Sequence, residues 1–242
     1  MAVNIDTLYQ KVLSLANKEQ RGYITPQEFN LYADHAQKEI FEQYFYDLNQ
    51  FSRMHGNSTS HSDMLDTLEM KISAFESWTD ISNIAVDING NANLQATFPD
   101  LHKIIEVFVD YGDGYKKAEE VTAKEFTKYS QSPLTIYSEK RPVYVHYFDN
   151  NDTIKIYPLP EISSDIKVNY VRTPNRPNWG YVVLNDKALY NANSSNNFQL
   201  HRSEEQELVY KILKLAGINL DKGQVVQGAQ ALETQQVQQE KA

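Results

Sequence analysis

The chain has 242 residues, 41% of them hydrophobic, and a formal net charge of −9. This is the composition of a globular protein with one large core or two smaller ones. It contains no cysteine, which excludes disulfides, thiolate metal sites and cysteine nucleophiles. Its lysines and arginines are scattered instead of clustered, so we expect no basic face that grips nucleic acid.

Two helices are predicted at the start of the chain. Apolar residues recur at helical spacing over residues 5–16. Thr25-Pro26-Gln27-Glu28 has the pattern of a capping box and opens a second helix over residues 26–50. The two form an N-terminal helical hairpin over residues 1–51, and the small polar residues of 52–64 predict an exposed loop.

A β-rich domain is predicted over residues 65–202, where apolar residues alternate with polar ones. Two glycines between Tyr111 and Tyr115 predict a hairpin turn, and a capping box at Thr122 to Glu125 predicts a short helix near 122–130. Residues 166–172 are expected to extend the hairpin made by the two strands before them. The predicted strands are 65–74, 84–88, 94–98, 103–110, 143–148, 153–157, 166–172, 181–184 and 188–190.

The C-terminal part is predicted to be a helix followed by a tail. Ser203-Glu204-Glu205-Gln206 has the pattern of a third capping box, and the helix over 203–217 is expected to stop at Gly217. Residues 218–242 are glutamine-rich and predict an extended segment that gains order only on binding a partner. The fold class is therefore α+β, with the N-terminal hairpin and the C-terminal helix flanking a mostly antiparallel sheet.

The loop between the first two helices matches part of a calcium-binding EF-hand pattern. Residues 17–28 place Gly22, Ile24 and Glu28 at the positions that the twelve-residue loop requires. However, Arg21 puts a cation where the ion needs a carboxylate oxygen. We therefore interpret the segment as a glycine-turned helical hairpin, and a calcium-regulated binding module is the alternative.

Other sequence patterns give no support for an enzyme. The six histidines show no paired metal spacing, and the chain has no nucleophile elbow, phosphate-binding loop or nucleotide fingerprint. We expect no catalytic residue, metal or cofactor, and a hydrolase with an unrecognised carboxylate pair is the enzymatic alternative. The N-terminus lacks the charged and apolar regions of a signal peptide, so no membrane partner is expected.

Two segments are candidates for binding a partner. Residues 172–179 combine prolines with Arg172, Arg176 and Trp179, which are residue types favoured at interaction hot spots. A rigid loop that packs on its own domain explains the same residues equally well. In the tail, the candidate partner-binding residues are Gln224, Val225, Val226, Leu232 and Val237.

Three stretches carry a resemblance to a known family. The first is LANKEQRGYITPQEFNL, which begins at Leu15 and runs on through the helix to Tyr46. The others are IKIYPLP at 154–160 and IKVNYVRTP at 166–174. They resemble the head-to-tail connector proteins, also called adaptor or ring proteins, of short-tailed phages, and most closely those of crAss-like and marine phages.

The resemblance implies a virion structural protein in the neck or tail region, assembled in the host cytoplasm. Subunits of that family form a ring, here expected to have twelve copies, between the portal protein and the tail. The implied partners are other copies of the chain, the portal protein, other connector or tail proteins, and genomic DNA that passes through the lumen without specific binding. The family supplies no catalytic residues, and its C-terminal tails dock on the portal or a neighbouring subunit. Another phage neck or tail subunit is the alternative.

Overall fold

The chain folds into two compact units. The computed structural model describes residues 2–17, 24–53, 59–78, 84, 86–87, 89–147, 152–160, 166–185, 187–219, 231, 234–235 and 238. The first unit, here called the helical unit, comprises Met1–Lys71 and Pro174–Ala242, and the second, the sheet unit, comprises Ile72–Thr173. The α+β class predicted from the sequence is confirmed.

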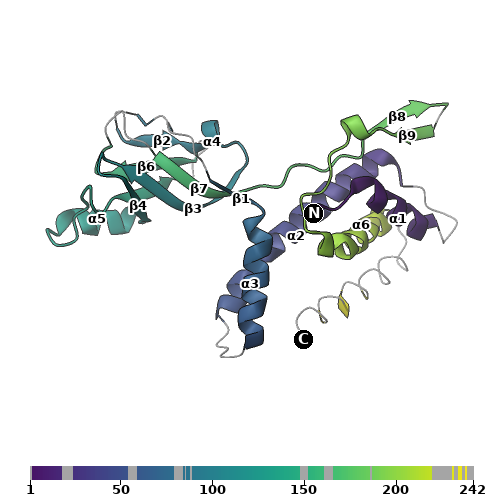
Figure 1. The fold of residues 1–242 in the computed structure, drawn as a ribbon, viewed down its shortest axis with the longest axis horizontal. Coiled ribbons are helices and arrows are strands. Elements are labelled where there is room, and N and C mark those ends of the chain that lie inside the picture. The colour runs from purple at the N-terminus through teal and green to yellow at the C-terminus, as the bar shows by residue number, and fades with distance from the viewer. Residues whose placement is uncertain are drawn as a thin grey trace. The chain divides into compact units, whose positions relative to one another are not determined.

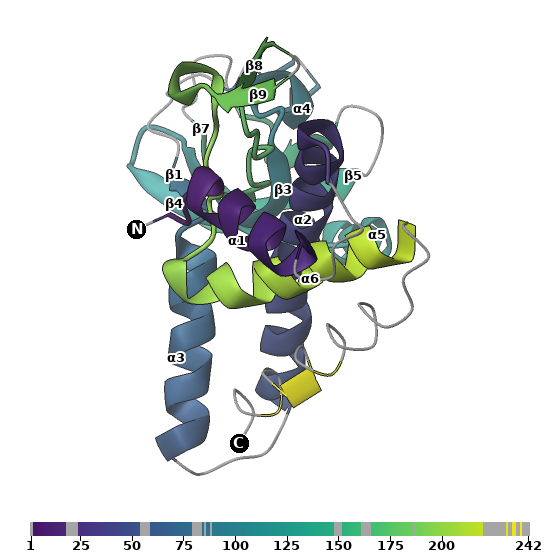
Figure 2. The same cartoon turned by 90° about the vertical axis from the view of Figure 1, so that its right-hand side faces the viewer.

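The helical unit is built on three helices that lie side by side: α1 (Ile5–Asn17), α2 (Pro26–Arg53) and α6 (Glu205–Asn219) (Figures 1 and 2). A 3₁₀ turn, η2 (Arg202–Glu204), precedes α6, and a second, η1 (Ala192–Ser194), lies earlier in the chain. Helix α3 (Thr59–Ser73) leads into the sheet unit. The apolar stripe of each helix faces the other two, as amphipathic spacing dictates. Fully buried side chains of this core include Leu8, Val12, Phe29, Ile40, Leu208 and Ile212.

Helix α2 begins where its capping box predicts. The Thr25 backbone N–H donates to Glu28 Oε2 at 3.0 Å, and the Glu28 backbone N–H donates to Thr25 Oγ1 at 3.3 Å. Together these reciprocal bonds satisfy two N–H groups that the first helical turn would leave without partners. They also hold the pKa of the Glu28 carboxyl below its usual range, because the bonds from Thr25 favour the charged form.

Two buried charged residues link the helices of this unit. Lys211 on α6 is 3% exposed, and its Nζ lies 2.8 Å from Glu39 Oε1 on α2 and 3.6 Å from Glu207 Oε1. Glu204 in η2 is 2% exposed and accepts from Lys71 Nζ at 2.7 Å. A charge at such a depth is tolerated only when it is paired, so these contacts fix the register between the helices.

The sheet unit contains a seven-stranded sheet in the order β1-β7-β3-β4-β5-β6-β2 (Figure 1). All neighbouring strands are antiparallel except β4 and β5, which are parallel. The strands are β1 (Glu76–Trp78), β2 (Asn91–Asn93), β3 (Leu101–Asp110), β4 (Tyr115–Glu120), β5 (Val143–Tyr147), β6 (Thr153–Tyr157) and β7 (Ile166–Arg172). Two short helices complete the unit, α4 (Leu94–Thr97) and α5 (Ala123–Gln131).

The sheet unit has two clusters of buried apolar residues. The main core is a mostly aliphatic cluster that includes Val107, Ile154, Ile156, Ile166 and Val168. A smaller cluster forms under α5, where the ring of Phe126 stacks on Tyr157 with 4.2 Å between ring centroids. The capping box at Thr122 that predicted this helix is present, with both reciprocal bonds.

The predicted turn between β3 and β4 is also present. Gly112 and Gly114 have φ angles of +102° and +95°, which are open to glycine at little cost. Their N–H groups both donate to Asp110 Oδ1, at 2.8 and 3.0 Å. The aspartate therefore stabilises the turn that its two glycines make possible.

A separate two-stranded hairpin belongs to the helical unit. Strands β8 (Tyr181–Leu184) and β9 (Lys187–Tyr190) pair with each other and extend beyond α1 in Figure 1. The hairpin itself was predicted, but its assignment to the large sheet was wrong. Its strands follow the segment from Pro174 onward, which has already returned to the helices.

Two other predictions of local structure are wrong. Residues 59–73 form α3, so the predicted loop over 52–64 ends early and the strand over 65–74 does not exist. Residues 94–97 form α4 instead of the predicted strand over 94–98, because the Asn93 side chain accepts from the Ala96 N–H at 3.0 Å and caps a helical turn.

The topology and the last helix also differ from expectation. Strand β7 pairs with β1 and β3 and does not extend the β5–β6 hairpin. The capping box predicted at Ser203 is replaced by a 3₁₀ turn, in which His201 is the capping residue and accepts from the Ser203 N–H. Helix α6 continues past Gly217 to Asn219.

Candidate functional site

Trp179, a candidate partner-binding residue, lies in the core of the helical unit. It is 3% exposed, and its ring centroid lies 4.4 Å from that of Tyr9 on α1. Its indole N–H donates to Asp6 Oδ1 at 2.9 Å. Of the two interpretations of this segment, the structure therefore supports packing on its own domain for Trp179, and the expectation that its ring meets a partner is corrected.

Buried amide side chains on α2 explain why the segment around Trp179 is fixed. Asn30 Oδ1 accepts from the Trp179 backbone N–H at 2.7 Å, and Asn30 Nδ2 donates to the Trp179 carbonyl at 3.2 Å. Two helical turns further along α2, Gln37 Nε2 donates to the Asn175 carbonyl at 2.8 Å, and Gln37 Oε1 accepts from the Gln199 N–H at 3.0 Å. A loop that packs against a helix has no neighbouring strand to pair with its buried N–H and C=O groups. The side-chain amides of Asn30 and Gln37 supply those hydrogen bonds instead.

The two candidate arginines belong to different units. Arg172 is the last residue of β7 in the sheet unit, and its backbone N–H donates to the Phe75 carbonyl at 2.9 Å. Arg176 belongs to the helical unit, where its side chain is exposed and its carbonyl accepts from Asn196 Nδ2 at 2.9 Å. Arg176 is thus the candidate of this segment whose side chain is open to solvent.

The remaining sequence candidates fall outside the described residues. This is true of the tail residues Gln224, Val225, Val226, Leu232 and Val237, and of residues 18–23 in the loop that resembles an EF-hand. At the end of that loop, the Glu28 carboxylate accepts from the backbone N–H and the hydroxyl of Thr25 at 3.0 and 2.8 Å. The side chain that would bind calcium at the twelfth position therefore caps a helix.

A surface that the sequence reasoning missed lies on the β8–β9 hairpin. Directly paired residues share a face, so Val182 opposite Leu189 and Leu184 opposite Lys187 form one face, here called the outer hairpin face. Val182, Leu184 and Leu189 are 53%, 58% and 50% exposed. The opposite face is anchored, because the rings of Tyr181 and Tyr190 lie 5.8 and 5.7 Å from that of Trp179.

The sequence held a weak signal for this surface. Val182-Val183-Leu184 is apolar at every position, whereas a strand with one solvent-facing side alternates between apolar and polar residues. Such a run indicates a strand that is covered on both faces. Here the described residues cover neither face fully, since Val183 on the side of Tyr181 and Tyr190 is also exposed. Because the run was assigned to the large sheet, its exposed apolar face was not predicted.

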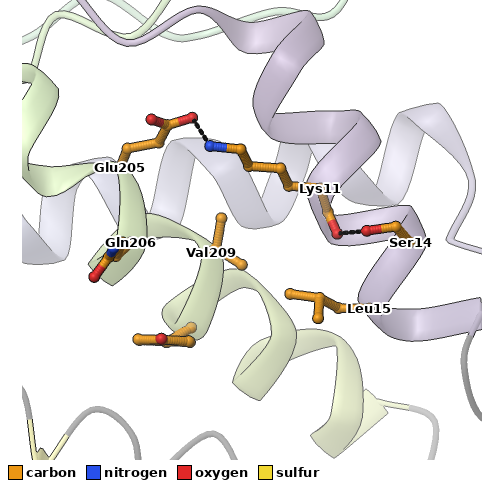
Figure 3. A pocket seen from close by; sticks show the side chains of 7 residues that line it. Lys11, Ser14, Leu15, Glu205, Gln206 and Val209 are labelled. Atoms are coloured by element: carbon orange, nitrogen blue, oxygen red, sulfur yellow. Dashed lines mark hydrogen bonds and ion pairs between the residues drawn. The ribbon is translucent and has the colours of Figure 1, made fainter.

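Two cavities open on the helical unit. The first, of about 270 Å³, lies between α1 and α6, with an apolar floor that includes Leu15 and Val209 (Figure 3). Lys11 Nζ and Glu205 Oε1 close its rim with an ion pair of 2.6 Å, drawn as a dashed line in Figure 3. Because this pair is self-neutralising, the rim has no charge left to select an ionic ligand.

The second cavity, here called the α2–α3 groove, has about 380 Å³ and a different character. Phe51 on α2 and Met64 and Leu68 on α3 supply apolar surface. Asp47 and Asp63 also line it, together with Lys71, whose charge is paired with Glu204 at 2.7 Å. The groove therefore combines apolar side chains with two carboxylates.

The described ranges hold neither a metal-binding cluster nor a membrane-spanning helix. Among those residues, no three histidine, aspartate or glutamate side chains are grouped as a metal ion would require. None of the helices in the same part of the chain combines the length and hydropathy needed to cross a membrane. In comparisons with known proteins, no family model matches the chain and no curated protein is significantly similar to it.

Proposed function

We propose that the chain is a virion structural protein that forms a head-to-tail connector ring between the portal and the tail of a phage and continues its DNA channel. The observation that carries the proposal is the resemblance of residues 15–46, 154–160 and 166–174 to connector proteins of short-tailed phages. The role is one of assembly, and it requires no catalytic residue.

The positions of these stretches in the fold support the proposal. The first contributes the N-terminal three-quarters of α2, including Asn30 and Gln37, which hold the returning segment after Pro174. The other two contribute β6 and β7 and the point at which the chain leaves the sheet unit. The resemblance thus falls on residues that build the framework of both units, as expected if the whole fold is shared.

The charge of the chain suits a conduit for DNA. A net charge of −9 repels phosphates, and a ring built from such subunits would carry a strongly negative potential. A lysine or arginine that contacts a phosphate releases the counterions condensed on the DNA, and this release favours binding. Each such contact would therefore slow the passage of DNA through the ring. A negative subunit lets DNA pass without being held.

Stoichiometry in purified particles is the test of this proposal. We expect the chain to be present in a one-to-one ratio to the portal protein, as measured by quantitative mass spectrometry of labelled peptides.

Deleting residues 223–242 should leave the melting temperature of the isolated protein nearly unchanged but abolish its incorporation into particles, because we propose that the tail docks on the portal or a neighbour. A copy number far above that of the portal would refute the ring and favour a decoration or fibre protein.

A further inference from the structure

The outer hairpin face has no partner among the described residues, although its composition requires one. Val182, Leu184 and Leu189 are each at least half exposed and adjacent to one another across the two strands. Isolated two-stranded hairpins are only marginally stable in water, and exposed apolar strands tend to pair with another chain. A face of this kind is normally covered in the assembled protein.

The α2–α3 groove has the chemistry to cover it. The groove offers Phe51, Met64 and Leu68 to apolar side chains, and its volume of about 380 Å³ lies in the range of sites that bury ligand groups. The outer hairpin face ends in Lys187, which is exposed. Asp47 and Asp63 of the groove supply the opposite charge. An apolar row that ends in a cation therefore matches a groove lined by apolar side chains and two carboxylates.

The hairpin cannot reach the groove of its own chain. It begins beside Trp179, which is bonded to Asn30 on α2, whereas Phe51 of the groove lies 21 residues further along the same helix. At 1.5 Å per residue this is a separation of about 30 Å. The five residues from Trp179 to the tip at Leu184 span only about 17 Å when extended. A hairpin that docks in this groove must therefore belong to a different molecule.

We infer that the outer hairpin face of one copy docks in the α2–α3 groove of the next copy, so that identical subunits join head to tail. The two surfaces differ, so the contact is heterologous and repeats around a closed ring or along a filament. For a chain of net charge −9, contact between copies requires such local complementarity to offset general repulsion. The inference rests on the proposed ring, for which it supplies the contact between neighbours.

The experiment uses purified full-length protein and sedimentation velocity over a series of concentrations. We expect the wild type to form oligomers larger than dimers. Leu184→Asp should weaken association at least about 100-fold, since it removes an apolar side chain from the contact and forces a carboxylate into an apolar groove. Val183→Asp is the matched control, because Val183 is 60% exposed on the same hairpin but on the opposite face, and it should assemble like the wild type.

Mixing variants tests the head-to-tail geometry. A groove variant, Asp47→Lys with Asp63→Lys, should be monomeric like Leu184→Asp. Both substitutions alter exposed or half-exposed side chains, and circular dichroism checks that the variant folds. An equimolar mixture of the two variants keeps one intact hairpin and one intact groove, and it should give dimers and nothing larger. Combining the groove change with Lys187→Glu in one chain should restore part of the association, because the charges are exchanged.

Several results would overturn the inference. A wild type that stays monomeric at every concentration would do so, as would assembly of Leu184→Asp equal to that of the control. Loss of Leu184→Asp from particles without loss of self-association would assign the hairpin to another virion protein. In these cases a one-to-one ratio to the portal would leave the proposed connector role intact, whereas a different ratio with intact self-association would refute that role and not the contact.

Discussion

Replacing Asn30 by leucine should destabilise the helical unit by about 3 kcal/mol. Asn30 is 9% exposed and makes two hydrogen bonds to the backbone of Trp179 and one to Asn178 Oδ1. Leucine has a similar size but leaves the Trp179 N–H and C=O buried without partners, at about 1–3 kcal/mol for each group. The better helix propensity of leucine recovers about 0.5 kcal/mol of this loss.

The assay uses the fact that each unit contains one tryptophan, Trp179 in the helical unit and Trp78 in the sheet unit. In a Trp78→Phe background, urea unfolding followed by fluorescence reports the helical unit alone. The matched control is Asn49→Leu, which makes the same substitution at an exposed position of the same helix and should change the free energy of unfolding by less than about 0.5 kcal/mol. Equal unfolding free energies for the two variants would refute the role given to Asn30.

Three further predictions concern other parts of the chain. Thr25→Ala should lower the free energy of unfolding by about 1 kcal/mol by removing the cap of α2. Part of that stabilisation comes from the bond between the Thr25 hydroxyl and the Glu28 carboxylate. Because the folded-state pKa of Glu28 is lowered, this part is present at neutral pH and is lost as the pH falls through the folded-state pKa, so the difference between the thermal melts of wild type and variant should narrow in acid. Ile154→Ala should cost about 2–5 kcal/mol in the sheet unit, measured by circular dichroism, since Ile154 is fully buried. Burial, with a smaller effect of Glu139, raises the pKa of Tyr111 to about 12, so stability should fall as the pH rises from about 10 toward 12, and Tyr111→Phe should flatten that decline.

Local signals in the sequence were sufficient to locate two helices with capping boxes and one turn with two glycines. The capping boxes at Thr25 and Thr122 located α2 and α5 because the bonds they predict join residues three apart and do not depend on the rest of the fold. The turn at Gly112 and Gly114 was predicted for the same reason. The same pattern was not sufficient at Ser203, where a 3₁₀ turn capped by His201 forms instead.

Helix α3 shows where such reasoning fails. Leu65, Leu68 and Ile72 are three and four residues apart, which is helical spacing, but Met70 between them suggested alternation. The structure leaves Met70 74% exposed, so it does not belong to the buried stripe. The choice between the two periods depended on one side chain whose burial is set by tertiary packing.

The candidate site depended on information that is not local. The pairing of β7 with β3, rather than with β6, and the return of the chain to the helices after Thr173 are properties of the topology. Without them the hairpin at Tyr181 was placed in the large sheet, and its exposed apolar face was not recognised. Trp179 was ambiguous for a related reason, because its hydrogen-bond partner Asp6 is separated from it by most of the chain.

The division of the chain has a consequence for the order of folding. The sheet unit is an insertion of about 100 residues between the two halves of the helical unit, and closing a loop of that length carries an entropic cost. Its first and last strands are neighbours, with Glu76 paired to Val171, so once the sheet forms, the two ends of the insertion are held next to each other. The effective loop then shortens to a few residues, which lowers the closure cost by roughly 2–3 kcal/mol. The two halves of the helical unit can therefore associate at a low entropic cost only after the sheet unit has folded. A short turn of matching span could replace the sheet unit.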